Sequence, residues 1–321
     1  MLAAPSEESG IRIDELLHIR QVPQDAEKIA QVRQMLADED AGLLASFQHA
    51  ATSLPVPGDD TTGFVDGHCI WRYLVARNGD CKKASAMLLD MLRWRREHRP
   101  QVFRAAEFEN EGLTGKVRLT GKDRHGRPVI VLDNTVENTR DVDAQMRHLA
   151  WHLERATRRM REGVQKYFIF IHFENFSLWN APPMKASRET LKLLQLIFAE
   201  RLGHVVGYRV PLYFHVFYAA LKPFIDAKTE SKVVLIRNKS DDAAFAPGSA
   251  NDDKMRALVG DQWRELCGVD QPTKAGSACG FDQPTYWAEV QEEQKAWAEA
   301  VAAAGGDAGA GAAPPLAPSS E

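Results

Sequence analysis

The feature of this sequence that most clearly suggests a function is a long apolar stretch with a cluster of charged residues at its end. Residues 211–225 read PLYFHVFYAALKPFI, with apolar and aromatic side chains nearly all round a helix. The charges that follow are Lys222, Asp226, Lys228, Glu230 and Lys232. Such a helix is either wholly buried or covers something apolar that is not protein. The periodicity leaves a deep core helix open, but charges at one end favour a lid over an amphiphilic ligand.

Sequence motifs of common enzymes are absent from the chain. It contains no GxSxG elbow, no GxxxxGK phosphate loop followed by Ser or Thr, and no HExxH helix. His148 and His152 are four residues apart on an expected helix, but no third ligand follows at a suitable spacing, so we interpret them as a polar helix flank. His172 is interpreted as a hydrogen-bonded histidine near the core. We therefore expect no catalytic residue, no metal and no cofactor.

The composition is that of an ordinary globular protein, with 321 residues, 44% of them hydrophobic, and a formal net charge of -4. The lack of basic excess argues against a nucleic-acid-binding role. The first ten residues lack the basic start and apolar core of a signal peptide, and the four cysteines form no CxxC pair, so we expect free thiols in a reducing, cytoplasmic compartment. The apolar window 202–221 contains Arg209, which costs about 2.5–3.5 kcal/mol in a bilayer centre, so we expect no membrane span.

The order of expected helices and strands predicts an α/β protein with an N-terminal helical unit. Apolar periodicity predicts helices within residues 11–50 and then from 64 to 77 and from 81 to 99, with Asn78-Gly79 as a stop signal and Asp80 as the next cap. After residue 113, short strands are separated by helices of 12 to 20 residues, which requires crossover connections and a largely parallel sheet. The strands are expected at 116–121, 128–133, 166–173, 204–210 and 232–237.

Four stretches in this order resemble successive landmarks of the CRAL-TRIO family of lipid-binding proteins. They are residues 71–98 (WRYLVARNGDCKKASAMLLDMLRWRREH), 126–133 (GRPVIVLD), 198–206 (FAERLGHVV) and 221–236 (LKPFIDAKTESKVVLI). The resemblance covers about residues 64–270. It implies the family fold, a small helical unit followed by an α/β lobe whose hydrophobic pocket is closed by a mobile gating helix. The apolar stretch described above falls where that gating helix lies.

Periodicity, composition and the resemblance together predict a division of the chain into five segments. Residues 1–63 are expected to be a helical extension and linker, residues 64–112 the helical unit, and residues 113–270 the lipid-binding lobe. A C-terminal helix is expected within 271–304. The low-complexity stretch 305–321 is expected to be disordered.

A headgroup site follows from the resemblance to the phosphatidylinositol/phosphatidylcholine transfer proteins within this family. Their inositol-phosphate site matches Arg77, Glu200, Thr229 and Lys232. Lys232 would supply a point charge for the phosphodiester, and Arg77 would donate to the same site or order the residues around it. Glu200 would accept from inositol hydroxyls, and the Thr229 hydroxyl would bond either phosphate or sugar.

Departures from the family pattern reduce the range of ligands that this chain is expected to bind. Asn78 stands where lysine is usual in this branch, which removes one phosphate-facing charge. The hydroxyl residues that hold the choline phosphate correspond to Tyr167, Ile169 and Leu194, and two of these are apolar here. The resemblance therefore implies phosphatidylinositol and argues against phosphatidylcholine as the second ligand.

We therefore expect a carrier that holds a phosphatidylinositol-type phospholipid and exchanges it with membranes. The alternative is a regulatory scaffold that senses a lipid, a sterol, a retinoid- or tocopherol-like molecule, or haem, without net transfer. For haem, His172 lies near the right strand, but Phe173 or Glu174 occupies the tyrosine position of the haem-binding branch. The expected pocket and gate residues are Phe168, Phe170, Leu212, Phe214, Phe217, Tyr218, Leu221 and Phe224.

The expected partners follow from the same resemblance. They are the phospholipid and, transiently, an intracellular membrane surface, with no nucleic acid; a protein bound through the N- or C-terminal helices stays open. We expect a monomer, because a tight interface would hinder a moving gate. The basic residues of the helix 141–163 are interpreted as a solvated face, with contact to anionic lipid headgroups as the alternative. They are Arg147, Arg155, Arg158, Arg159 and Arg161.

Overall fold

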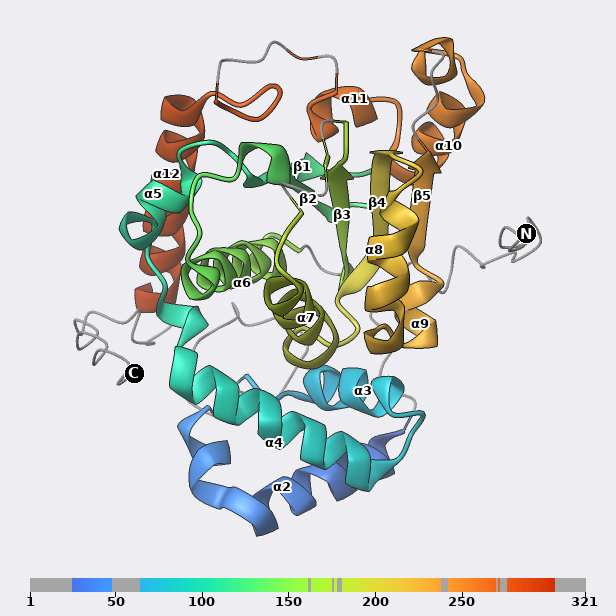
Figure 1. Cartoon of the computed structure of the whole chain (residues 1–321). Coiled ribbons are helices and arrows are strands. Elements are labelled where there is room, and N and C mark those ends of the chain that lie inside the picture. Colours follow the sequence, from blue (N-terminus) through green and yellow to red (C-terminus); the bar gives the residue numbers. More distant parts are fainter. Residues whose placement is uncertain are drawn as a thin grey trace.

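The computed structural model describes residues 25–47, 64–160, 163–174, 176–177, 181–237, 242–269, 271 and 276–303. Within these ranges the chain forms a helical unit that packs beneath an α/β part built on a five-stranded sheet (Figure 1). The linker expected at 52–63, the tail expected at 305–321 and the helix start expected at residue 11 lie outside the described residues.

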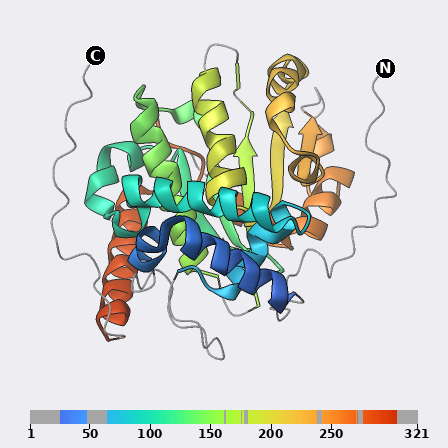
Figure 2. The same ribbon diagram turned by 90° about the horizontal axis from the view of Figure 1, so that it is seen from below.

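Three helices form the N-terminal unit, and Figure 2 shows two of them, α2 and α4, lying across one end of the molecule. They are α2 (Ala26–Ser46), α3 (Gly67–Ala76) and α4 (Cys81–His98). Asp66 and Asp80 begin α3 and α4 by accepting a backbone N–H of the first turn, at 2.6 and 3.0 Å. Asn78 and Gly79, both with positive φ, follow the end of α3. The predicted stop signal and cap are therefore confirmed.

The sheet has the strand order β1-β2-β3-β4-β5, in which β1 and β2 are antiparallel and the remaining pairs are parallel. This confirms the predicted α/β class and the largely parallel sheet. The strands are β1 (Val117–Lys122), β2 (Pro128–Leu132), β3 (Tyr167–His172), β4 (Leu202–Val210) and β5 (Val233–Arg237). Successive parallel strands are joined by α6 (Val142–Arg158), by α7 (Met184–Lys192) with η4 (Leu193–Ile197), and by α8 (Phe214–Leu221), η5 (Lys222–Phe224) and α9 (Ala227–Glu230).

Short helical turns complete the described chain. They are η1 (Pro100–Val102), η2 (Ala105–Phe108), α5 (Glu109–Gly112), η3 (Asn134–Val136) and η6 (Asp242–Phe245). The remaining helices are α10 (Ala250–Val259), α11 (Trp263–Cys267) and α12 (Gln283–Ala303). No helix in the described ranges combines the length and the apolar content that crossing a bilayer requires.

The side chains of β3 alternate between two different cores. Tyr167 and Ile169 belong to the core that α4 and α6 share with the sheet. Phe168 and Phe170 are fully buried on the opposite face, where they pack with Trp263 of α11. The expectation that Phe168 and Phe170 line the pocket is therefore wrong, because successive side chains of a strand point to opposite faces of the sheet.

The C-terminal helix α12 packs back onto α6. Arg155 and Arg159 of α6 form ion pairs with Glu293 at 2.6 and 2.8 Å, and the guanidinium of Arg158 lies 4.4 Å from the ring centre of Trp297. The interpretation of Arg155, Arg158 and Arg159 as part of a solvated face is wrong, because α12 packs on them. Arg147 forms an ion pair with Glu107 at 2.6 Å, and Arg161 lies outside the described residues. The contacts of α6 with α12 join residues more than 130 positions apart, so no local sequence pattern could predict them.

Candidate functional site

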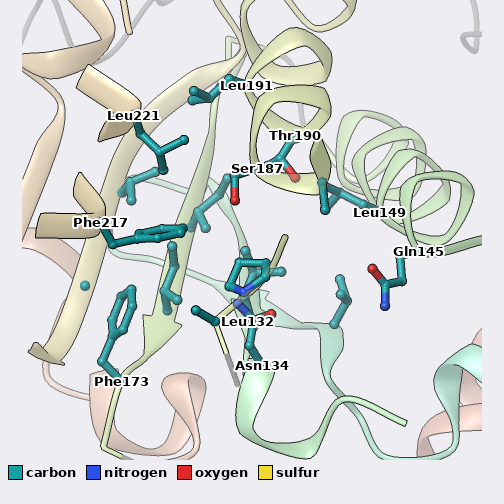
Figure 3. Close-up of a pocket in the computed structure, with 18 of the residues that line it drawn as sticks. Leu132, Asn134, Gln145, Leu149, Phe173, Ser187, Thr190, Leu191, Phe217 and Leu221 are labelled. Atoms are coloured by element: carbon teal, nitrogen blue, oxygen red, sulfur yellow. The ribbon is translucent and has the colours of Figure 1, made fainter. Parts of the chain in front are cut away.

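A cavity of about 650 Å³ lies between the sheet and the helices α6, α7 and α8 (Figure 3). The strands contribute Leu132, Ile169, Ile171, Val205, Val233 and Leu235, and the helices contribute Leu149, Leu191 and Leu194. Cavities of about 300–1,000 Å³ with mostly apolar walls are typical of sites for small hydrophobic molecules. The sequence predicted a pocket in this lobe, and the structure places it on the face of the sheet that carries Ile169 and Ile171.

Helix α8 forms one wall of the cavity and is apolar on both of its sides. Phe214, Phe217, Tyr218 and Leu221 line the cavity, as expected from the sequence. Two further predicted residues, Leu212 and Phe224, are not among the cavity-lining residues and are exposed, Leu212 by 73%. Val216 is likewise 75% exposed. The solvent side of this segment therefore exposes the apolar side chains of Leu212, Val216 and Phe224.

Few polar contacts hold the two ends of this wall. At its start, the hydroxyl of Tyr213 donates to the carbonyl of Phe176. At its end, the Gln195 side chain donates to the carbonyl of Phe224 at 3.0 Å and accepts from the amide of Asp226 at 3.3 Å. Gln195 was not among the residues that the sequence singled out, because its partners lie about thirty positions away. Between these contacts, the rings of Phe214 and Phe217 pack against Phe176, with ring centres 5.7 and 6.2 Å apart, so the wall is held by aromatic packing as well as by its polar ends.

A second group of polar side chains lies at the end of the cavity formed by β1 and the first turns of α6. The buried ammonium of Lys116 contacts Glu111, Glu137 and Thr139. His148 is fully buried beside this group, and neither of its ring nitrogens has a hydrogen-bond partner among the described residues. Burial, and then the charges of Lys116 and an arginine of α6, lower the His148 pKa to about 3. The interpretation of His148 and His152 as a polar helix flank is wrong, because both are fully buried: His148 lies against Phe108 of η2, and His152 contacts the Tyr286 hydroxyl of α12 at 3.2 Å.

The charged edge of the site lies where β4 and β5 begin. The Glu200 carboxylate is 7% exposed and forms ion pairs with Lys228 at 2.8 Å and with Lys232 at 3.5 Å. Glu200 has a φ of 58°, a left-handed conformation that few residues other than glycine adopt and that therefore indicates a constrained turn. Burial alone would raise the Glu200 pKa, but Lys232 and Lys228 outweigh it and lower the pKa. Burial lowers the Lys232 pKa.

Three of the four predicted headgroup residues come together in the structure. Thr229 lines the cavity, its hydroxyl donates to Asp226 at 2.8 Å, and its carbonyl accepts from the amide of Lys232 at 3.1 Å. Arg77 is exposed just after α3 and donates to the carbonyl of the preceding residue at 3.0 Å. Within the described residues, no hydrogen bond or ion pair joins Arg77 to Glu200 or Lys232. The headgroup role of all four residues stays a prediction.

His172 points away from the cavity. Its Nε2 donates to the carbonyl of Cys267 in α11 at 2.7 Å, and burial lowers its pKa. It shares the opposite face of the sheet with Phe170, whose ring centre lies 4.9 Å from that of His172. The hydrogen-bonded core histidine expected from the sequence is confirmed, and the geometry does not offer His172 to a ligand in the cavity.

Comparison with known proteins gives three findings that bear on this cavity. Residues 113–246 match the family model described as the CRAL/TRIO domain. The chain is 34% identical over 165 residues to the CRAL-TRIO domain-containing protein C23B6.04c of Schizosaccharomyces pombe, which covers 51% of this chain and 16% of that protein. It is 29% identical over 180 residues to the phosphatidylinositol transfer protein PDR17 of Saccharomyces cerevisiae, which covers 52% of this chain and 51% of that protein.

A solved structure, the crystal structure of Sfh5, shares the fold. It superposes with a TM-score of 0.54 at 15% identity and covers 84% of this chain and 98% of that chain. At this identity the match supports the fold alone. The chain spans about half of PDR17 and a smaller share of C23B6.04c.

Proposed function

We propose that this chain, whose residues 113–246 match the CRAL/TRIO domain model, carries an inositol phospholipid in the apolar cavity and exchanges it with membranes. The observation that carries the proposal is the segment 212–221, formed by α8 and the two residues before it, which is apolar toward the cavity through Phe217 and apolar toward solvent through Leu212 and Val216. One helix can therefore cover acyl chains when closed and meet a bilayer when open. The similarity to a protein named as a phosphatidylinositol transfer protein supports the same ligand class.

The cavity would hold the acyl chains. Each methylene removed from water contributes about 0.8 kcal/mol, so two long chains in this cavity bind strongly and leave only when the gate opens. The weak polar ties at Tyr213 and Gln195 would give the gate its two hinges. No chemical step on the ligand is proposed, and incubation with labelled lipid followed by a search for cleaved product tests that point.

The headgroup would sit against the charged edge, next to the end of the gate. Lys232 would pair with the phosphodiester, Glu200 would accept from ring hydroxyls, and Thr229 would bond phosphate or sugar. Arg77 would have to leave the carbonyl to which it now donates in order to join them. Because Thr229 follows the gate directly in the chain, headgroup binding and gate closure would be coupled.

The surroundings of the site support a carrier that visits membranes transiently from a reducing compartment. All four cysteines, Cys69, Cys81, Cys267 and Cys279, are free thiols, which suits the cytoplasm. The sequence suggested that the terminal helices α2 and α12 could bind a protein partner. Instead, α2 packs against α4 and α12 packs against α6 of the same chain. We therefore propose a monomer whose contact surface is the outer face of α8.

Transfer between two populations of vesicles tests the function. The purified chain should move labelled phosphatidylinositol from donor to acceptor vesicles. The double variant Glu200→Ala with Lys232→Ala should transfer at least tenfold more slowly, because hydrogen bonds to charged groups contribute about 1.5–3 kcal/mol each. An unchanged rate in the double variant would remove the headgroup assignment. Binding without transport would favour the regulatory scaffold.

A further inference from the structure

The apolar cavity has a polar end that the headgroup site does not use. Asn134 follows β2, and Gln145 and His148 lie on α6; all three line the cavity. Thr229, at the charged edge, precedes β5. Because β2, β3, β4 and β5 are successively parallel, the residues after β2 and the residues before β5 lie at opposite edges of the sheet. The end at Asn134 is therefore remote from the proposed inositol headgroup.

Three side chains at this end have hydrogen-bonding atoms without partners. His148 is fully buried, and both of its ring nitrogens are unpaired within the described residues. The side chain of Asn134 makes no hydrogen bond with any described residue. The Nε2 of Gln145 donates to the carbonyl of Thr139 at 3.1 Å, and no described residue donates to its Oε1. Figure 3 shows Asn134 and Gln145 among the side chains around the cavity.

Contacts between neighbouring elements bring these side chains to one place. The residue before Asn134 donates its backbone N–H to the carbonyl of Lys116 at 2.8 Å. The Lys116 ammonium contacts the hydroxyl of Thr139 at 3.0 Å, and the carbonyl of Thr139 accepts from Gln145. Lys116 is also close enough to His148 for its charge to act on the imidazole.

This end of the cavity carries no net formal charge. Lys116 contacts Glu111 and Glu137, and Arg140 also lines the cavity, so two cations accompany two carboxylates. Burial, and then the charge of Lys116, lower the His148 pKa to about 3, so the imidazole is neutral at pH 7. A neutral imidazole has one N–H donor and one acceptor nitrogen. The unpaired atoms here therefore include both donors and acceptors and no charge.

An uncharged hydroxyl is the group that fits such a set. It can donate to an imidazole nitrogen or to an amide oxygen, and it can accept from an amide N–H. A phosphate offers only acceptors and binds best to charged donors. An acyl chain at this end would leave the atoms of His148 and Asn134 unpaired in apolar surroundings, which is unfavourable.

We propose that Asn134, Gln145 and His148 bind the hydroxyl of an uncharged lipid alcohol whose apolar body lies along the cavity. Fatty alcohols and sterols share this chemistry. The polar group of the alcohol lies at the end of the cavity opposite to that proposed for the inositol headgroup. The assignment does not rest on the inositol lipid, although an alcohol held in this way would compete with its acyl chains for the same apolar walls.

Extraction from vesicles by the full chain tests this assignment. The purified chain is incubated with phosphatidylcholine vesicles that contain equal small amounts of octadecanol and octadecane, each with its own radiolabel, and the labels on the protein are counted after the vesicles are removed. A second pair, cholestanol and cholestane, tests a sterol body. The members of each pair differ only in the hydroxyl. The alcohol should be retained about tenfold or more over the alkane in one pair or in both, because the chain replaces the hydrogen bonds that the hydroxyl makes at the vesicle surface.

Three variants test the residues. Asn134→Leu with Gln145→Leu removes the amides at similar side-chain size and should reduce the ratio of alcohol to alkane to less than about twofold. Asn138→Leu, the same change at an exposed position outside the cavity, is the matched control and should retain the ratio. His148→Leu should also lower the ratio. Its free energy of unfolding at pH 7 should not fall, since the change removes an unpaired buried imidazole.

Equal retention of alcohol and alkane in both pairs would overturn the assignment. So would a preference for the alcohol that persists in the double variant. A lower free energy of unfolding in His148→Leu with an unchanged preference would show that the imidazole is already paired without a ligand, and would overturn the assignment as well. Failure of the unmodified chain to transfer phosphatidylinositol would remove the proposed function and leave the alcohol site standing.

Discussion

The outer face of α8 gives a quantitative prediction about membrane contact. The double variant Leu212→Ser with Val216→Ser replaces the two most exposed apolar side chains of this wall, one just before α8 and one within it, and so removes the surface that would enter the bilayer. These side chains are 73% and 75% exposed, so nearly three quarters of each is available for transfer from water. Because they contribute little to the folded core, the free energy of unfolding should change by less than about 0.5 kcal/mol per site.

The magnitude follows from the exposed fractions. Complete burial of a leucine or valine side chain contributes about 1.5–3 kcal/mol. Three quarters of the lower value gives about 1.1 kcal/mol for each residue and about 2.2 kcal/mol for the pair, since the two sites add when they act independently. With a factor of ten for every 1.4 kcal/mol, the partition coefficient onto vesicles should fall roughly 40-fold.

Flotation of the protein with neutral phosphatidylcholine vesicles measures this coefficient, and a urea titration measures stability. The matched control is Leu113→Ser, which removes an exposed apolar side chain near β1, away from α8. The control should float as the unmodified chain does. Equal flotation of all three proteins, or an equal loss in the double variant and the control, would refute the assignment of α8 as the membrane-contact face.

Two other predictions concern stability. His204 and His148 have folded-state pKa values lowered by burial to about 4 and about 3. The unfolded chain therefore binds more protons below about pH 6.5, and stability should fall as pH falls through that range, by roughly 2 kcal/mol per histidine at pH 5. Urea unfolding at pH 7 and pH 5 checks this, and His204→Asn should lose less stability than the unmodified chain over the same interval. Phe170→Ala should lower the free energy of unfolding by about 3–5 kcal/mol. The ligand that copurifies with the chain should be unchanged, because Phe170 lies on the sheet face opposite the cavity. Loss of that ligand at unchanged stability would instead show that Phe170 lines the cavity.

Local signals predicted much of the architecture. Asp80 and the Asn78-Gly79 pair fixed the boundary between α3 and α4, since capping and positive φ depend on a few neighbouring residues. The alternation of strands with long helices predicted the parallel sheet because parallel strands require crossovers. Phe214, Phe217, Tyr218 and Leu221 of α8 line the cavity as the sequence suggested.

Features of the structure that depend on contacts between residues far apart in the sequence could not be predicted from such local patterns. Strand β3 is apolar on both faces, as strands of buried parallel sheets are, so the sequence could not say that Ile169 rather than Phe168 meets the cavity. The burial of His152 involves Tyr286 of α12, which follows it by more than a hundred residues.

Mass spectrometry of the small molecules that copurify with the native chain tests the central claim most directly. The chain is purified without detergent, extracted with organic solvent, and compared with a Phe217→Asp variant whose cavity wall carries a charge. The account predicts an inositol phospholipid in the extract of the unmodified chain, in near-stoichiometric amount, and its depletion in the variant. An extract that contains a sterol, a retinoid or a haem and no inositol phospholipid would contradict the account, while the fold and the cavity would stand.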